Sequence, residues 1–216
     1  MMSKKIGILG SGSVAQTLAS GFLKYGYQVM MGTRDPQKLN DFIGKSSGKI
    51  LVGSFLETAQ FGEIIVLAVK GSIAKSLVTE ISNALVGKVV IDPTNPISDQ
   101  TPVDGVLHFF TDINKSLMEE LQEISPSAHF VKAFSCIGGN FMVDAEFNGI
   151  RPSMFICGND THAKGEVTQV LHQFGFDVED MGSVVSARAI EPLCMLWCIP
   201  GLKNNSWSHA FKLLRK

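Results

Sequence analysis

Short apolar segments alternate with segments of helical periodicity along the chain, and this alternation predicts an α/β fold. Apolar runs of strand length occur at residues 5–9, 27–31, 50–52, 63–69, 88–92, 128–134 and 154–158, and an eighth strand is expected at the sheet edge, at 176–179. Between them, apolar residues recur at helical spacing near 14–23, 55–61, 73–81, 115–124 and 161–174. This order favours a Rossmann-type, doubly wound, mostly parallel sheet.

The end of the chain departs from this alternation. A segment at 186–214 follows the eighth strand and is predicted to be helical around a break at Pro200-Gly201. We therefore expect residues 1–150 to form one domain and residues 151–216 a small C-terminal α/β and helical extension packed on it as a single compact unit. Residues 98–111 show no clear period and are predicted to be a surface loop.

The first predicted strand and helix are joined by a Gly-x-Gly turn within the sequence Lys-Ile-Gly-Ile-Leu-Gly-Ser-Gly-Ser-Val-Ala of residues 5–15. A dinucleotide site requires this order, because Gly10 permits a sharp reversal and Gly12 leaves the backbone amides open to a pyrophosphate. Ala15 lets the helix pack close to the strand. The alternative is a strand–helix turn that merely needs small residues.

The turn after the second predicted strand is basic. NAD sites usually place an acidic residue here to bind the ribose 2′-hydroxyl, yet no acid occurs between residues 28 and 34. Thr33, Arg34 and Lys38 instead offer a hydroxyl, a guanidinium and an ammonium to a 2′-phosphate. Asp35 precedes a proline and is interpreted as a helix N-cap. The sequence therefore favours NADP over NAD, the alternative being two solvated surface charges.

Three more loops follow predicted parallel strands and are expected at the same sheet edge. Because ligands bind at the carboxyl ends of such strands, residues 68–70 should border the cofactor, although Lys70 could equally be a solvated lysine. The loop 93–97 contains two prolines and is stiff enough to position a nicotinamide; Asn95 either contacts the cofactor or fixes its own turn. The glycine-bearing turn 135–140 either admits a flat ligand or is an ordinary strand exit. His129 begins a strand and is interpreted as structural.

Composition narrows the classes of partner. With 216 residues, 45% hydrophobic and 18% charged, the chain is expected to form a compact globular protein. A net charge of −1 gives no reason to expect nucleic acid or an anionic membrane as partner. The apolar runs are too short to span a bilayer, and the N-terminus runs straight into a strand, so we expect a cytoplasmic protein. The four cysteines show no metal-ligand spacing and are expected to be buried thiols.

No set of side chains indicates acid–base or nucleophilic catalysis, so no catalytic residue and no metal ligand is predicted. The absence of such motifs favours a reaction whose chemistry lies in cofactors, with the protein supplying position and exclusion of water. Hydride exchange between NADPH and a second flat redox ring fits this description.

The ordered motifs resemble the NADP oxidoreductases dependent on the deazaflavin coenzyme F-420, and the related reductase domain of six-transmembrane metalloreductases. The residues that carry the resemblance are Ile8–Val14, Gly32–Arg34, Asp92–Ile97, Val131–Phe134 and the C-terminal Ala187-Arg188-x-x-Glu191-Pro192-Leu193. The resemblance covers nearly the whole chain and implies NADP(H) as cofactor, with a deazaflavin or flavin as a second substrate.

The predicted site follows from the loops above and from this resemblance. The expected cofactor-binding residues are Gly10, Ser11, Gly12, Ser13, Val14, Thr33, Arg34, Lys38, Ala68, Val69, Lys70, Thr94, Asn95, Pro96 and Gly139. The second substrate is expected over the nicotinamide, near Ile137, Gly138, Asn140, Phe141 and Met195. The apolar surface around Leu193–Trp197 either lines this crevice or meets a second subunit, so a homodimer is expected.

Three functions remain open at the level of sequence. The favoured one is hydride transfer between NADP(H) and F-420 or a flavin-type coenzyme. The second is reduction of a small imine or carbonyl substrate, as in the pyrroline-5-carboxylate reductases. The third is a non-catalytic NADP-binding sensor or partner domain.

Overall fold

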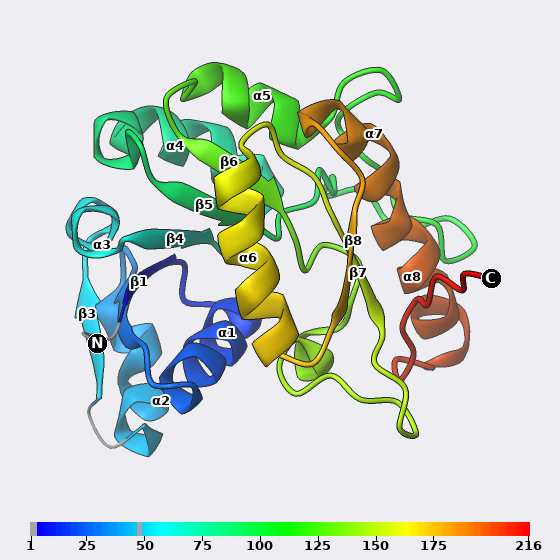
Figure 1. The fold of residues 1–216 in the computed structure, drawn as a ribbon, viewed down its shortest axis with the longest axis horizontal. Coiled ribbons are helices and arrows are strands. Elements are labelled where there is room, and N and C mark those ends of the chain that lie inside the picture. Colours follow the sequence, from blue (N-terminus) through cyan, green and yellow to red (C-terminus); the bar gives the residue numbers. More distant parts are fainter. Residues whose placement is uncertain (1–3, 47–48) are drawn as a thin grey trace.

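The computed structural model describes residues 4–46 and 49–216, and a six-stranded parallel sheet lies at its centre (Figure 1). The strands are β1 (Lys5–Leu9), β2 (Gln28–Gly32), β3 (Ile50–Gly53), β4 (Ile64–Leu67), β5 (Val89–Asp92) and β6 (His129–Lys132). They lie in the order β3-β2-β1-β4-β5-β6, and each neighbouring pair is parallel. The strand order reverses beside β1, as in doubly wound dinucleotide-binding folds. The predicted fold class is confirmed.

Helices cover both faces of the sheet. They are α1 (Ser13–Lys24), α2 (Asn40–Lys45), α3 (Phe55–Phe61), α4 (Gly71–Leu85), α5 (Leu117–Ile124), α6 (Thr161–Gln173), α7 (Ala187–Ile190) and α8 (Pro192–Asn204). Short 3₁₀ turns lie at Pro36–Leu39, Gly139–Phe141 and Val184–Ser186. In Figure 1, α1 and α2 lie on one side of the sheet, and α4 and α5 lie on the other.

Strand β4 shows why the buried strands are apolar throughout. Alternate side chains of a strand point to opposite faces, so a strand covered on both faces needs apolar residues at every position. Ile64 and Val66 pack in the core that contains Phe22 of α1, whereas Ile65 and Leu67 pack in the core that contains Leu77 of α4.

The expectation that the eighth strand forms the edge of this sheet is wrong. β7 (Ser153–Ile156) and β8 (Asp177–Asp180) pair in parallel with each other as a separate two-stranded sheet. An antiparallel bridge between Lys132 and Cys157 connects it to the end of β6. Because β6 and the segment after β7 run in opposite directions there and meet only at their ends, the parallel sheet does not continue into β7.

The predicted helix at 186–214 is correct only in its first part. The helical segment continues through Pro200 and ends before Asn205, which has a left-handed conformation with φ of 52°. Asparagine tolerates this conformation better than most residues, so it can end a helix. The following residues form no regular secondary structure and pass beside β7, where the Ser153 N–H donates to the Phe211 carbonyl at 2.9 Å. The expected helix at 205–214 is therefore absent.

The helical run Val184–Asn204 is, among the described residues, the only segment long and apolar enough to cross a membrane by length and composition. It is packed against the domain through Ala187, Ile190, Cys194 and Trp197. Glu191 lies in the middle of the run and is also buried. Of the apolar stretch that meets this test, 33% is buried inside the structure.

Candidate functional site

The turn between β1 and α1 has the geometry of a phosphate cradle. Gly10 has a φ of 138°, and a Cβ added there would lie 2.1 Å from the Ala68 carbonyl oxygen, so only glycine fits. A Cβ added at Gly12 would meet nothing within 4 Å. None of the side chains that the structure describes caps the N-terminus of α1, and the first turn of α1 carries no acidic residue. The first amide groups of α1 are therefore open to an anion in front of Gly12.

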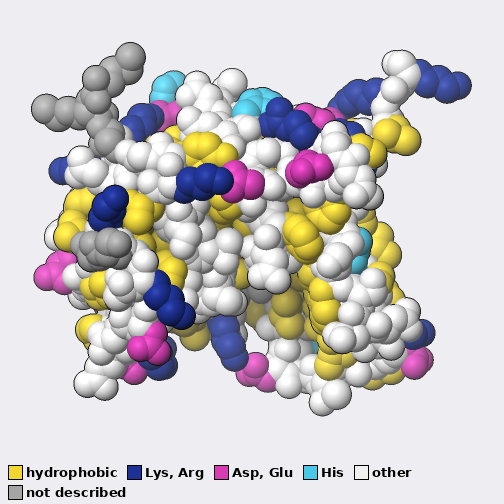
Figure 2. Space-filling model, turned by 90° about the horizontal axis from the view of Figure 1, so that it is seen from below, with side chains coloured by type: hydrophobic (Ala, Val, Ile, Leu, Met, Phe, Trp, Pro, Cys, Tyr) yellow, Lys and Arg dark blue, Asp and Glu magenta, His cyan; other side chains and the backbone are white. Residues whose placement is uncertain are grey.

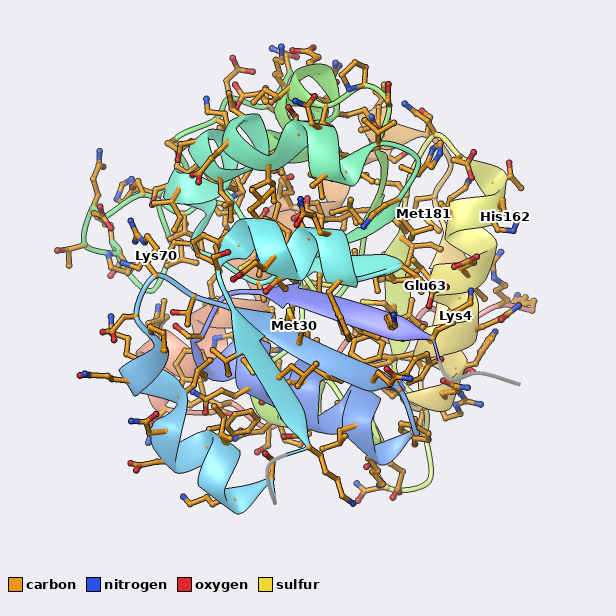
Figure 3. All side chains as sticks on the ribbon, turned by 90° about the vertical axis from the view of Figure 1, so that its left-hand side faces the viewer. Lys4, Met30, Glu63, Lys70, His162 and Met181 are labelled. Atoms are coloured by element: carbon orange, nitrogen blue, oxygen red, sulfur yellow. The ribbon has the colours of Figure 1, made fainter. Side chains whose placement is uncertain are left out.

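A cleft of about 390 Å³ adjoins this cradle at the carboxyl ends of β1, β4 and β5. The N-terminus of α4 borders the cleft too, and this helix is likewise not capped by any described side chain. Figure 3 shows Lys70, which precedes α4, at the end of the sheet remote from Lys4 and Glu63. The predicted cofactor-binding residues that line the cleft are Gly12, Ser13, Val14, Ala68, Val69, Lys70, Thr94 and Asn95.

The basic turn lies directly beside the glycine turn, because the Gly10 N–H donates to the Gly32 carbonyl at 2.9 Å. Thr33 is buried, and its hydroxyl lies 3.4 Å from the Ser11 hydroxyl. Arg34 is exposed and has no hydrogen bond or ion pair with any other residue that the structure describes. The Asp35 carboxylate accepts from the Gln37 N–H at 3.2 Å, which confirms its interpretation as an N-cap.

Lys38 lies on the 3₁₀ turn that follows. Its ammonium is 3.9 Å from the Asp35 carboxylate, and both side chains are exposed. Such an exposed, long pair constrains Lys38 little, so the ammonium stays available to a phosphate beside Arg34.

Asn95 joins two of the predicted loops and leaves one polar atom unpaired. Its side-chain amide donates to the Ser135 carbonyl at 2.7 Å, so it fixes the neighbouring loop instead of its own turn. Its buried Oδ1 has no hydrogen-bond partner among the described residues, nor has the buried Oγ of Ser135. Buried polar atoms rarely stay unpaired, so this end of the cleft is suited to a polar ligand group. Pro96, in the same loop as Asn95, is buried.

The residues predicted to bind the second substrate are not brought together. Ile137 belongs to the core, and a Cβ added at Gly138 would lie 2.8 Å from the Trp197 ring. Asn140 lines a separate hollow beside α1, and Phe141 packs on Phe147 with ring centroids 4.9 Å apart. Gly139 has open space around it and does not line the cofactor cleft.

Met195 lies in a second pocket of about 280 Å³. This pocket is lined by Phe109, Thr111, Asp112, Ile113, Ser116, Arg188, Glu191, Pro192 and Met195. Ile97 lines the cofactor cleft and Phe109 lines the second pocket. An isolated antiparallel β-bridge between these two residues connects the walls of the two cavities. Figure 2 shows a hollow on the face seen there, with hydrophobic side chains inside it and gathered to one side of it.

Arg188 forms a two-pronged ion pair at the rim of the second pocket. Its Nε donates to Glu119 Oε2 at 3.0 Å, and its Nη2 donates to Glu119 Oε1 at 2.6 Å. Burial raises the pKa of Glu119, but the hydrogen bonds from Arg188 and from Ser116 outweigh it and lower the pKa to about 2. Glu119 is therefore held as a carboxylate by its partners.

The opposite end of the sheet carries a polar hollow with two histidines. The His129 ring lies 3.7 Å from the Asp160 carboxylate and is partly exposed. His129 stands at the first position of β6, where the strand emerges from the core. Within residues 4–46 and 49–216, no group of three His, Cys, Asp or Glu side chains is arranged to hold a metal ion.

Comparison with known proteins adds to this geometry. Residues 5–96, which contain the glycine turn, the basic turn and the loop up to Pro96, match the family described as NADP oxidoreductase, coenzyme F-420-dependent. Metalloreductase STEAP3 of Rattus norvegicus is 32% identical over 202 residues, which are 92% of this chain and 38% of that protein. Metalloreductase STEAP2 of Homo sapiens is 28% identical over 189 residues. The chain thus spans well under half the length of these curated relatives.

Solved structures also resemble this chain, and one of them carries a description similar to that of the matched family. A candidate F-420-dependent NADP reductase from Arthrobacter sp. FB24 superposes with a TM-score of 0.91 and 29% identity, over 99% of this chain and 100% of that one. The predicted family resemblance is confirmed. A pyrroline-5-carboxylate reductase from Coxiella burnetii, at 16% identity and a TM-score of 0.62, covers 84% of this chain and 60% of that one, and shows a shared fold only.

Three of the motifs that carry the resemblance meet at one point of this chain, a buried charge cluster that their sequences alone did not reveal. Lys132 is fully buried, and its ammonium lies 2.7 Å from the Asp92 carboxylate and 2.9 Å from that of Glu191. The ammonium also donates to the Thr94 carbonyl at 2.8 Å. The sequence could have indicated this cluster, because Lys132, Asp92 and Glu191 stand in apolar segments and charged residues are almost never fully buried unless paired.

Proposed function

We propose that this chain is an NADP(H)-dependent oxidoreductase that transfers hydride between NADP(H) and the deazaflavin F-420 or a flavin-type coenzyme. The cleft supports this proposal most strongly, because two uncapped helix N-termini, an open glycine cradle and a basic turn border or adjoin it. These features are complementary to a pyrophosphate and a 2′-phosphate.

The cofactor would be held in three parts. The amides at Gly12, Ser13 and Val14 would bind the pyrophosphate, helped by the N-terminus of α4. Thr33, Arg34 and Lys38 would bind the 2′-phosphate, with Arg34 offering a planar fork that fits it. The nicotinamide would lie beside Val69 and Asn95, where the unpaired Asn95 Oδ1 accepts a hydrogen bond from it.

The lining of the cleft is suited to positioning and not to proton transfer. Lys70 and Asp99 are its ionisable side chains among the described residues; the others are small, apolar or neutral. NADPH, when bound, supplies the hydride, and the acceptor ring takes that hydride together with a proton from solvent. The protein holds the two rings in contact and keeps water from between them.

The names of the relatives favour one variation of this reaction. The two curated relatives reported above are named metalloreductases, so in this variation a flavin reduced by NADPH here would pass its electrons on to a metal ion. In this variation the chain itself still performs hydride transfer to a flavin. We expect a cytoplasmic homodimer as the acting form.

The test is anaerobic oxidation of NADPH with F-420, FMN, FAD and riboflavin offered separately, and with each flavin plus a ferric chelate. The proposal predicts turnover with one ring system and faster oxidation with NADPH than with NADH. Binding of NADPH without turnover on any ring would favour the sensor function, and turnover on pyrroline-5-carboxylate alone would favour the imine reductases.

A further inference from the structure

The loop Pro93–Pro96 is held by a buried ion network that extends beyond the cofactor cleft. The Asp92 Oδ1 accepts from the Thr94 N–H at 2.9 Å and from the Thr94 hydroxyl at 2.6 Å. The Lys132 ammonium donates a hydrogen bond to the Thr94 carbonyl at 2.8 Å. Every polar group of Thr94 is thus bound by the pair Asp92–Lys132, which fixes the backbone on which Asn95 follows.

The loop also packs against α4 without spare room. A Cβ added at Gly71, the first residue of α4, would lie 2.0 Å from the Asn95 carbonyl oxygen. The Asn95 side chain in turn lines the cleft and donates to Ser135 at 2.7 Å. A shift of Thr94 would therefore move Asn95 relative to the N-terminus of α4 and to the loop after β6.

Glu191 ties this network to the C-terminal helices. Its two carboxylate oxygens accept from the N–H groups of Leu117 and Met118, both at 3.0 Å, at the start of α5. The same carboxylate lies 2.9 Å from the Lys132 ammonium. Glu191 directly precedes α8, which begins at Pro192. The network therefore connects β5, β6, α5 and α8 to the cofactor loop.

The charges of the network favour a fixed arrangement. Burial alone lowers the pKa of Lys132, but the adjacent carboxylates of Asp92 and Glu191 more than offset this, and the pKa lies above its ordinary value. One ammonium faces two carboxylates, and the excess negative charge is met by N–H groups at the start of α5 and by Thr94. Losing Lys132 leaves two carboxylates buried without a cation, so an arrangement of the loop that separates them from the ammonium is costly.

We propose that Lys132 is a positioning residue for the nicotinamide end of the cofactor: through Thr94, and with Asp92 and Glu191, it sets the placement of Asn95 in the cleft. This inference rests on the proposed function. The network does not reach the glycine turn or the basic turn, so its effect should be confined to one half of the dinucleotide.

The experiment compares two ligands on the purified full chain. NADPH carries the nicotinamide, whereas 2′,5′-ADP carries only the adenosine and the phosphates that the glycine turn and basic turn would bind. Dissociation constants are measured for the wild type, Lys132→Met and Glu191→Gln, the latter serving if Lys132→Met does not fold. Lys88→Met is the matched control, since its ammonium also binds backbone carbonyls, those of Ala59 and Gly62, but near the amino ends of the strands.

We expect Lys132→Met and Glu191→Gln to weaken NADPH binding by about tenfold or more. Each substitution removes charge-assisted hydrogen bonds that hold the loop Pro93–Pro96, and with it Asn95, in place. Affinity for 2′,5′-ADP should stay within about twofold, and Lys88→Met should change neither ligand selectively. Equal weakening of both ligands, or no weakening of either, would overturn the positioning role. A wild type that binds both ligands equally well would overturn it too. A wild type that shows the expected binding but oxidises NADPH with no ring would overturn the proposed function alone.

Discussion

The ammonium of Lys132 lies 2.9 Å from the carboxylate of Glu191, and both side chains are almost completely buried. Each residue lies in a different motif of the family resemblance, and Asp92, which completes the group, lies in a third. We infer that the three motifs depend on one another, because the buried Lys132 ammonium of one motif is paired with the carboxylates that the other two supply.

Removal of the buried ammonium should strongly destabilise the fold. Lys132→Met leaves Asp92 and Glu191 as unpaired buried carboxylates, so the free energy of unfolding should fall by about 3–5 kcal/mol. Urea denaturation followed by far-UV circular dichroism measures this change. Lys24→Met removes an exposed pair with Asp144 and should leave the free energy of unfolding nearly unchanged. Equal stability of the two variants would contradict the buried network.

Two glycines of the same turn should respond differently to one methyl group. At Gly10 the backbone is left-handed and the Ala68 carbonyl is 2.1 Å from an added Cβ, so Gly10→Ala should lower the melting temperature. At Gly12 the added Cβ meets no protein atom, so Gly12→Ala should keep its melting temperature and lose affinity for NADPH. Thermal unfolding and nucleotide titration of both variants check this; a Gly12→Ala protein with unchanged affinity would speak against the cradle.

The basic turn should determine the choice between NADPH and NADH. Arg34→Ala removes an exposed guanidinium that has no partner among the described residues, so stability should be unaffected. Its loss should weaken NADPH about tenfold or more, as for a charge-assisted hydrogen bond, and leave NADH unchanged. Titration of both nucleotides into the wild type and the variant measures the ratio. Lys45→Ala, at the end of α2, is a control of the same charge change. An unchanged ratio in Arg34→Ala would remove the argument for NADP from this turn.

Glu119 should contribute to the acid sensitivity of the fold. Its pKa is lowered from 4.5 to about 2, since hydrogen bonds from Arg188 and Ser116 outweigh the opposing effect of burial. A lowered pKa means stability that is present above pH 4.5 and is lost as the pH falls through about 2. Glu119→Gln should therefore flatten the fall of the free energy of unfolding across this range, measured by urea titration at several pH values. Glu80→Gln, at an exposed position of α4, should leave the slope as it is.

The sequence predicted the features that depend on local order. The glycine turn, the N-cap at Asp35 and the apolar strand β4 each follow from residues a few positions apart, and the structure has them as expected. The position of Thr33 beside Ser11 also follows, because parallel strands end at the same sheet edge.

Long-range pairing accounts for what the sequence did not reveal. Lys132 stands in an apolar strand, and no local pattern shows that Asp92 and Glu191 will face it. After Asn205 ends α8, Trp207 packs over Gly201, a contact that apolar periodicity alone could not indicate. Four of the five residues predicted to bind the second substrate were chosen from one loop, but Ile137 of that loop packs in the core and Asn140 lines a separate hollow beside α1.

The central claim is hydride transfer from NADPH to a flavin or deazaflavin ring, and isotope transfer tests it most directly. NADPH deuterated at the nicotinamide C4 is mixed anaerobically with the protein and F-420, and the reduced deazaflavin is analysed by mass spectrometry. The deazaflavin accepts hydride at carbon, so a transferred deuterium does not exchange with water. The account predicts deuterium in the reduced deazaflavin, or, if only flavins are accepted, a primary isotope effect on flavin reduction. Deazaflavin that stays oxidised, together with flavins that are not reduced, would contradict it.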